Sequence, residues 1–299
     1  MRVAFSTSWI DGDISRLEAI LPYIDTLEVG TKGDPAFFSS LEKLVLKSGT
    51  PITSIHASAG PHKTSRDPYY TPYFISSNSS LRNYDIEQVA LTAEWATQLG
   101  ATAVIIHTGK VEDQALRMDF LGYKETLLRE GWSTRLEQMK SAIVERRKEL
   151  NKGFLPNLIN DLRYLCRSFP EVIFCIETRV NYYEVPLPDE AQYIFDYVHP
   201  PNLGYWHDVG HTYILEKLGF VPQNIWQNLL GAKCVGTHLH DVDPQLNDHL
   251  PPGDGLLNFP ALLRQFGGQL LHTLEIHSRH TLESVIRGIE RIRNYSISG

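Results

Sequence analysis

Histidines and carboxylates recur at the ends of short apolar segments of this chain. The pattern occurs six times, at His56, at His107, at Glu177, at Asp208 with His211, at His238 with His240, and at Glu275. Imidazole and carboxylate groups together suit Zn, Mn, Fe and Co better than Ca. If the segments end at one place, they predict divalent-metal chemistry, because a cation removes the repulsion among carboxylates that share a dry space.

The apolar segments themselves have the length and composition of buried strands, since they are short and rich in β-branched and aromatic residues. Eight of them alternate with helix-like stretches, namely Val3–Phe5, Thr26–Val29, Ile52–Ala57, Ala103–His107, Val172–Thr178, Leu203–Asp208, Cys234–Asp241 and His272–His277. This alternation predicts an α/β fold, a single (β/α)8 TIM barrel that takes up residues 1–299. Active sites of such barrels lie at the C-terminal ends of the strands.

Two segments depart from the regular alternation. Residues 58–83 are polar and contain Pro and Tyr, which predicts a long loop after strand three, before a helix at Ile86–Leu99. Residues 109–170 are too long for one crossover, so we expect an extra helix after strand four. The basic run at 145–152 is interpreted as a solvated helix face.

Side-chain alternation along each strand tests whether the polar ends share the barrel interior. Glu177 shares a face with Cys175, His107 with Ile105, and Glu275 with Thr273. All of these polar ends can therefore point into the barrel mouth. A single histidine at a strand end is usually a polar group whose hydrogen bonds are satisfied within the protein. Polar residues at the ends of six strands together favour a metal site.

The composition of the chain bears on its partners, its cysteine chemistry and its location. The 299 residues include 28 Lys and Arg against 35 Asp and Glu, a net charge of −7 that argues against a nucleic-acid partner. The three cysteines form no C-x-x-C pair, which indicates reduced thiols. With no basic and apolar leader and no apolar run of membrane-spanning length, we expect a cytoplasmic protein without membrane contact. The number of subunits stays open.

The order of the motifs resembles that of the xylose isomerase-like barrels. This superfamily includes sugar phosphate isomerases and epimerases, and the endonuclease IV-like proteins of AP endonuclease family 2. The motifs are I-E-T at 176–178, H-D-V-G-H at 207–211, G-T-H-L-H-D at 236–241, H-L-P-P-G-D-G at 249–255 and L-E-I at 274–276. The resemblance implies one divalent metal (Zn, Mn, Co or Fe) on Glu177, Asp208, His238 and Glu275. It also implies that the two glutamates act as acid and base.

The resemblance leaves the number of ions between one and three. Endonuclease IV-like members use five further ligands, and four of these have counterparts here, at His56, His107, His211 and His249. The fifth position holds Asn247, with Asp248 beside it, and a neutral amide is a weaker ligand. A third metal is therefore in doubt, whereas a second on His56, His107 and Glu177 stays open.

Three functions follow from these residues. We predict a metal-dependent isomerase or epimerase that moves a proton next to the carbonyl of a small sugar or sugar phosphate. The alternatives are a two- or three-metal phosphoester hydrolase and a non-catalytic metabolite-binding barrel. For the substrate, the resemblance points to His211. Lys110 and Arg179 lie just beyond strand ends, where they could bind a phosphate or carboxylate, and Trp206 is a candidate for stacking on a sugar, with core packing as its alternative.

Overall fold

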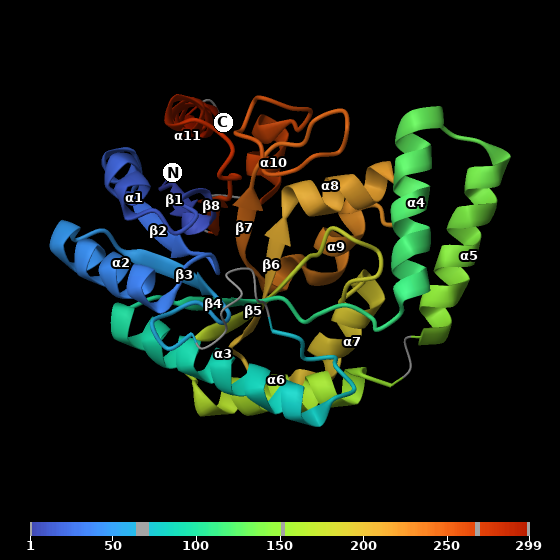
Figure 1. Cartoon of the computed structure of the whole chain (residues 1–299), viewed down its shortest axis with the longest axis horizontal. Coiled ribbons are helices and arrows are strands. Elements are labelled where there is room, and N and C mark those ends of the chain that lie inside the picture. Colours follow the sequence, from blue (N-terminus) through green and yellow to red (C-terminus); the bar gives the residue numbers. More distant parts are fainter. Residues whose placement is uncertain (1, 64–71, 151–152, 267–269, 298–299) are drawn as a thin grey trace.

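Eight parallel strands form a closed barrel at the centre of the molecule (Figure 1). The computed structural model describes residues 2–63, 72–150, 153–266 and 270–297. Neighbouring strands pair in chain order and β8 closes onto β1, which confirms the predicted TIM barrel. The strands are β1 (Ala4–Ser6), β2 (Thr26–Val29), β3 (Ile52–His56), β4 (Ala103–Ile106), β5 (Ile173–Glu177), β6 (Leu203–Asp208), β7 (Cys234–Leu239) and β8 (Leu271–Leu274).

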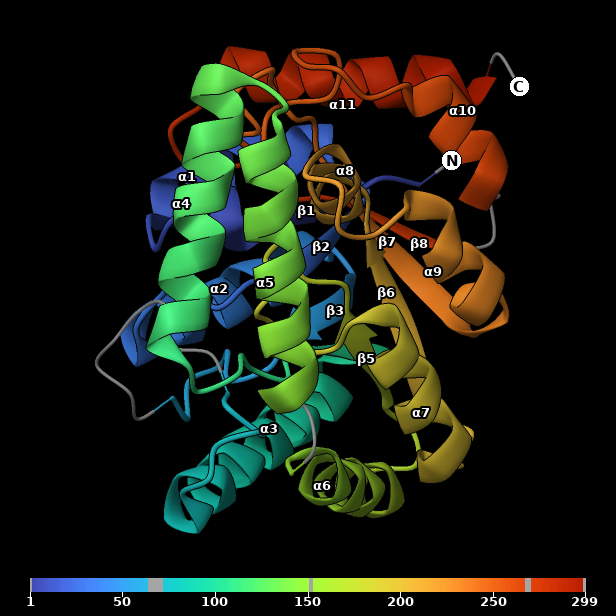
Figure 2. The ribbon, with the colours of Figure 1, turned by 90° about the vertical axis from the view of Figure 1, so that its right-hand side faces the viewer.

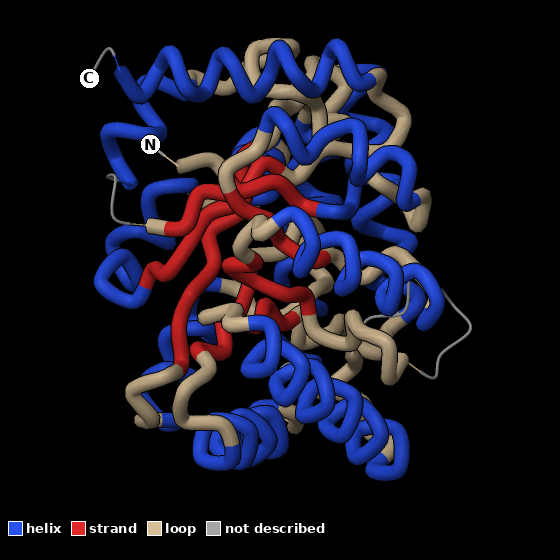
Figure 3. Tube along the Cα trace, turned by 90° about the vertical axis from the view of Figure 1, so that its left-hand side faces the viewer, coloured by secondary structure: helices blue, strands red, loops and turns tan. Residues whose placement is uncertain are grey.

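Helices surround the strands as an outer layer (Figures 2 and 3). They are α1 (Ile14–Ile20), α2 (Pro35–Ser48), α3 (Ser79–Leu99), α4 (Gln114–Glu130), α5 (Thr134–Leu150), α6 (Leu155–Ser168), α7 (Pro188–Val198), α8 (Val209–Lys217), α9 (Gln223–Leu230), α10 (Phe259–Phe266) and α11 (Leu282–Ile297). Short 3-10 turns lie at Thr7–Trp9, Leu21–Tyr23 and Gly231–Lys233. No helix in the described part of the chain has both the length and the apolar character needed to cross a membrane.

The two irregular segments of the sequence differ in detail from the expectation. Three helices, α4 to α6, connect β4 to β5, and α4 and α5 stand side by side as a hairpin at the edge of the barrel (Figure 1). The loop after β3 is shorter than predicted, because α3 begins at Ser79. The Asn78 side chain accepts hydrogen bonds from the backbone N–H groups of Ser80 and Leu81 and so caps this helix. Residues 64–71 of that predicted loop lie outside the described residues.

The interior of the barrel is filled by a small apolar cluster. Trp206 is fully buried there and packs with Ala103, Ile105 and Cys175, which point inward from β4 and β5. Gly236 on β7 makes room for the indole, because a Cβ at this position would lie 2.4 Å from two atoms of the Trp206 ring. The alternation predicted from the sequence is therefore correct for this interior face.

We expect Gly236→Ala to lower the free energy of unfolding by about 1–3 kcal/mol, because the rigid indole and the Leu271 carbonyl leave no room for a methyl group. Urea denaturation measures the change. Gly122→Ala is the matched control, since nothing lies within 4 Å of its added Cβ in α4, and alanine stabilises a helix interior by about 0.5–1 kcal/mol. Equal stability of Gly236→Ala and the wild type would show that the barrel interior is loosely packed.

The basic run at 145–152 is not solvated along its whole length, so that interpretation was wrong for one residue. Arg147 is 1% exposed and lies 2.7 Å from the carboxylate of Glu190 at the start of α7. It also donates to the backbone carbonyls of Tyr182 and Glu184. The reason is tertiary, because this face of α5 covers the segment between β5 and α7. Residues 151–152 of the run lie outside the described residues.

Candidate metal centre

The barrel brings together the four residues expected to hold a metal. Glu177 and Asp208 are the last residues of β5 and β6, His238 is the penultimate residue of β7, and Glu275 directly follows β8. Each offers a ligand atom within 4.8 Å of the others. Four neighbouring strands of a parallel barrel end at the same rim, which is why residues about a hundred positions apart converge.

The carboxylates surround one atom of the imidazole. His238 Nδ1 lies 3.0 Å from Glu177 Oε1, 3.2 Å from Glu275 Oε2 and 3.6 Å from Asp208 Oδ2. A single proton on Nδ1 can satisfy only one of these oxygens well. Three carboxylates and an imidazole form a mixed donor set that suits Zn, Mn, Fe or Co. The residues present therefore fit a divalent cation.

The electrostatics of this cluster favour positive charge at its centre. Burial by itself raises the pKa of Glu177, but His107 and Arg179 outweigh it and hold that pKa well below the usual range. Burial likewise lowers the pKa of His238, yet Glu275 and Glu28 outweigh it and raise that pKa well above its usual value. Ionised carboxylates concentrated in a buried space attract a cation, whether it is a proton on His238 or a metal ion.

A second cluster shares Glu177 and lies beside the first. His56, the last residue of β3, and His107, just beyond β4, each offer a nitrogen within 4.8 Å of a Glu177 oxygen. His107 Nε2 lies 2.5 Å from Glu177 Oε2. Burial and the nearby Arg179 lower the pKa of His107 to about 4, which keeps the ring neutral and its lone pair available. The arrangement can hold a second ion bridged through Glu177.

Two further histidines are oriented by backbone carbonyls. His211 Nδ1 donates to the carbonyl of Thr178 at 2.9 Å, and His249 Nδ1 donates to that of Glu275 at 3.0 Å. Carbonyls only accept, so each ring carries a proton on Nδ1, and Nε2 is the nitrogen left to bind an ion. With His240 they form a third group of possible ligands. His211 Nε2 lies 4.0 Å from Asp248 Oδ2.

Asn247 is tied to Asp243 by two hydrogen bonds. Its side-chain Nδ2 donates to Asp243 Oδ2 at 2.9 Å, and its backbone N–H donates to Asp243 Oδ1 at 2.9 Å. These bonds hold the amide within its own turn. The carboxylate nearest to His211 in this loop is therefore that of Asp248, one position further along the chain.

Three residues at the site were missed from the list of predicted ligands. Glu28 on β2 contacts both His56 and His238. Ser8 Oγ donates to Glu275 Oε1 at 2.9 Å. His240 Nε2 lies 2.9 Å from Asp208 Oδ1, while its Nδ1 accepts the backbone N–H of His249. A lone carboxylate within the apolar strand Thr26–Val29 was the one available sequence signal for Glu28.

Of the other residues predicted to contact the substrate, only Arg179 lies at the metal-site cluster. Arg179 lies at the cluster, where Nη1 donates to Glu177 Oε2 at 2.8 Å and Nη2 is 3.5 Å from Glu184 Oε1. Lys110 is exposed and lines a separate hollow with Tyr73 and other residues. Trp206 has no exposed surface, and its ring lies 5.4 Å from that of His238. It packs beneath the site and presents no face on which a sugar could stack, which corrects its assignment as a substrate contact.

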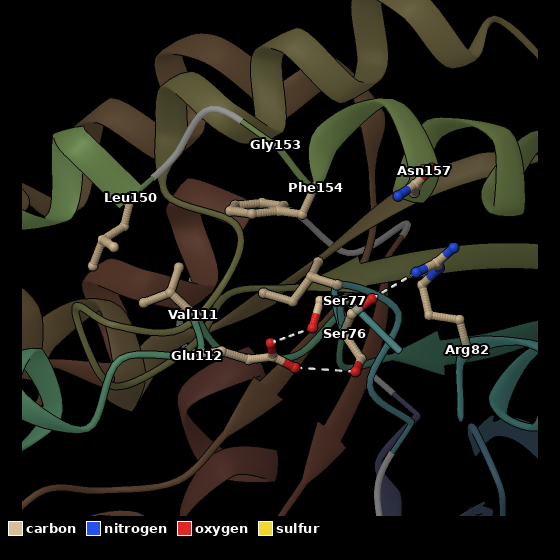
Figure 4. Close-up of a pocket in the computed structure, with 10 residues that line it drawn as sticks. Ser76, Ser77, Arg82, Val111, Glu112, Leu150, Gly153, Phe154 and Asn157 are labelled. Carbon is tan, nitrogen blue, oxygen red and sulfur yellow. Dashed lines mark hydrogen bonds between the residues drawn. The ribbon is translucent and has the colours of Figure 1, made fainter. Parts of the chain in front are cut away.

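A different hollow, of about 430 Å³, lies on the flank of the barrel between α3, α6 and the loop after β4 (Figure 4). Glu112 accepts hydrogen bonds there from Ser76 Oγ and Ser77 Oγ, and Arg82 donates to the Ser76 carbonyl. These groups satisfy one another and tie the loop after β3 to the loop after β4. None of the described residues that line this hollow is a candidate metal ligand.

Known proteins with this fold include enzymes that act on sugars. A D-tagatose 3-epimerase-like protein has 19% sequence identity and a TM-score of 0.66, covering 100% of this chain and 98% of that chain. The IOLI protein, solved with a zinc atom bound, has 14% identity and a TM-score of 0.66, covering 100% and 97%. Sugar epimerases recur among the other solved structures of this fold. At these identities, the likeness shows the fold alone.

Comparisons of the sequence itself give one curated relative and one family model. The uncharacterized protein y4fM of Sinorhizobium fredii (strain NBRC 101917 / NGR234) is 23% identical over an alignment of 235 residues, and the match covers 74% of this chain and 64% of that protein. The match thus spans less than two thirds of the length of this curated relative. A family model described as the xylose isomerase-like TIM barrel matches residues 38–295. The model covers most of the sequence, and the closed eight-stranded barrel is the fold that it describes. The chain therefore belongs to the xylose isomerase-like TIM barrel family.

Proposed function

We propose that the protein is a divalent-metal-dependent isomerase or epimerase that moves a proton on the carbon next to the carbonyl of a small sugar-like substrate. The observation that carries this proposal is the convergence of Glu177, Asp208 and Glu275 on Nδ1 of His238. These four residues would hold the ion. When bound, the ion supplies Lewis acidity that polarises the oxygens of the substrate.

The two glutamates are the groups that accept and return the proton. Glu177 comes from β5 and Glu275 follows β8, so the two carboxylates approach the centre from different strands. Ser8 Oγ holds Glu275 Oε1, and Arg179 Nη1 holds Glu177 Oε2, which leaves Glu275 Oε2 and Glu177 Oε1 facing His238. A carboxylate positioned within hydrogen-bond reach of a carbon-bound proton contributes about 10²–10⁴-fold to such a transfer.

The substrate class is supported by the neighbours and by the charge around Arg179. Proteins of this fold include a D-tagatose 3-epimerase-like protein and a 3-keto-D-glucoside 4-epimerase. Arg179 already faces Glu177 and Glu184, so its charge is largely neutralised by the protein. We therefore propose a neutral ketose or keto-sugar in preference to a sugar phosphate.

Solvent exchange tests this function directly. Free ketohexoses including D-tagatose, incubated with the enzyme in D₂O, should take up deuterium at the carbon next to the carbonyl, as read by NMR. A chelator should stop the exchange, and one equivalent of Mn, Co, Fe or Zn per chain should restore it. Exchange that persists in the metal-free protein, or no exchange with any ketose or keto-sugar, would contradict the proposal.

A two-metal phosphoester hydrolase is the second candidate, and one observation favours it. His56 and His107 share Glu177 with the four-ligand site, and an isomerase with a single ion does not need them as ligands. Two or more Zn per chain by plasma mass spectrometry would support this candidate, together with cleavage of a phosphate ester that is lost in His107→Ala. One ion per chain supports the isomerase.

A further inference from the structure

Glu28 is a buried carboxylate that belongs to none of the motifs in this sequence. It lies on β2, whereas the four proposed ligands come from β5 to β8, and its side chain has no exposed surface. It reaches His238 across 210 residues of sequence. A carboxylate without any contact with solvent is stable only when its oxygens have strong partners, so those partners indicate what it does.

The oxygens of Glu28 are shared between two histidine rings and one hydroxyl. Oε1 lies 3.0 Å from His238 Nε2 and 3.2 Å from His56 Nε2. Oε2 lies 3.2 Å from His238 Nε2 and accepts the Ser54 hydroxyl at 2.8 Å. The two rings are nearly parallel, with 5.2 Å between their centroids and 8° between their planes, so one carboxylate serves both Nε2 atoms.

The position of Glu28 relative to His238 differs from that of the other carboxylates. Glu177 and Glu275 face the Nδ1 atom of the ring, while Glu28 faces Nε2. An ionised carboxylate can only accept, so Nε2 of His238 donates to Glu28. A cation bound among Glu177, Asp208 and Glu275 would take the place of a proton on Nδ1 and meet the lone pair of a ring that keeps its proton on Nε2. A carboxylate behind the ring also makes the imidazole a stronger donor to a metal.

We propose that Glu28 is a positioning residue for the metal site: it fixes the tautomer and the orientation of His238 so that Nδ1 faces the ion. The same carboxylate holds His56 parallel to His238, which couples the four-ligand site to the second cluster. The role rests on the metal site of the proposed function, and it concerns metal affinity rather than the proton transfer itself.

Metal affinity of the folded protein is the measurement that tests this role. In Glu28→Gln the charge is lost, and the amide can donate to Nε2, which moves the ring proton to Nδ1. We expect the Kd for Mn²⁺ or Zn²⁺, measured by calorimetry on the full chain, to rise about 10–100-fold. The visible absorption bands of bound Co²⁺ should also shift, because the orientation of His238 changes. Circular dichroism verifies that the variant is folded.

Ser54→Ala is the matched control, since it removes a hydrogen bond to Glu28 but leaves the carboxylate on both rings. Its Kd should stay within about threefold of the wild type, well below the change that loss of the carboxylate brings. A folded Glu28→Gln protein with wild-type Kd and Co²⁺ spectrum would overturn the positioning role alone. A loss of affinity in His56→Ala as large as in His238→Ala would also overturn it, because the ion would then lie between Glu28 and the two rings. A wild-type protein that binds neither Mn²⁺ nor Zn²⁺ would overturn both this role and the proposed function.

Discussion

Glu177→Gln is expected to reduce solvent exchange into a ketose by about 10²–10⁴-fold and to remove most of the bound metal. The carboxylate is shared by two groups of possible ligands, and it lies 3.0 Å from His238 Nδ1 and 2.5 Å from His107 Nε2. A neutral amide keeps the volume but supplies neither the negative charge nor a strong base. Exchange rates by NMR and metal content by plasma mass spectrometry measure the two effects separately.

Glu184→Gln is the matched control for this substitution. Glu184 faces the same guanidinium, with Oε1 3.5 Å from Arg179 Nη2, but it belongs to none of the groups of possible ligands in the described chain. We expect its metal content to equal that of the wild type and its exchange rate to change by less than about tenfold, below the range expected for loss of an acid or base. Wild-type metal content and activity in Glu177→Gln would show that the site is assigned to the wrong residues.

Arg147→Met should have the largest effect on stability, and we expect it to lower the free energy of unfolding by about 3–5 kcal/mol. Arg147 and Glu190 are each 1% exposed at the side chain, with 2.7 Å between Nη2 and Oε1. Removal of the guanidinium leaves the buried Glu190 carboxylate without its charge partner. The backbone carbonyls of Tyr182 and Glu184 each lose the hydrogen bond that Arg147 donates to them. Urea denaturation followed by circular dichroism gives the value.

The neighbouring Arg146 provides the comparison on the same helix. Its exposed guanidinium pairs with Asp113 at 2.9 Å, and Arg146→Met should leave the free energy of unfolding nearly unchanged because water screens that pair. A double variant, Arg147→Met with Glu190→Gln, should recover much of the lost stability. The neutral amide needs no charge partner and still accepts the Leu187 N–H that Glu190 accepts at 2.7 Å. If Arg147→Met costs no more than Arg146→Met, the buried pair does not stabilise the fold.

The stability of α5 and the chemistry of the site are linked through one segment. Arg147 holds the carbonyls of Tyr182 and Glu184, and Glu184 in turn faces Arg179 beside Glu177. Loosening of this segment should therefore displace Arg179 before it displaces the ligands at the strand ends. Metal content should be less sensitive to Arg147→Met than the exchange rate is.

Much of the fold followed from patterns that are local in the sequence. Eight short apolar segments separated by helical stretches predict a parallel sheet, and the eightfold alternation is typical of the closed barrel that the structure has. Residues at the ends of neighbouring strands then meet at one rim, so the convergence of Glu177, Asp208, His238 and Glu275 could be predicted without coordinates. The interior face was also correct, because side chains alternate with period two whatever surrounds the strand.

Contacts across the barrel and between layers could be found only in the tertiary structure. Glu28 was a lone acid in an apolar strand until closure of the barrel placed it against Nε2 of His238, the nitrogen opposite the one that Glu177 and Glu275 face. The basic run in α5 gave no sign that Arg147 alone would be covered, because that depends on how the segment before α7 crosses the helix. Trp206 likewise became a packing residue because Gly236, on the neighbouring strand, leaves room for the indole. The sequence by itself determined which residues share an end of the sheet, since that depends on strand order and periodicity. Only the tertiary structure decided which nitrogen of each histidine faces which carboxylate, since that depends on distances between residues far apart in the chain.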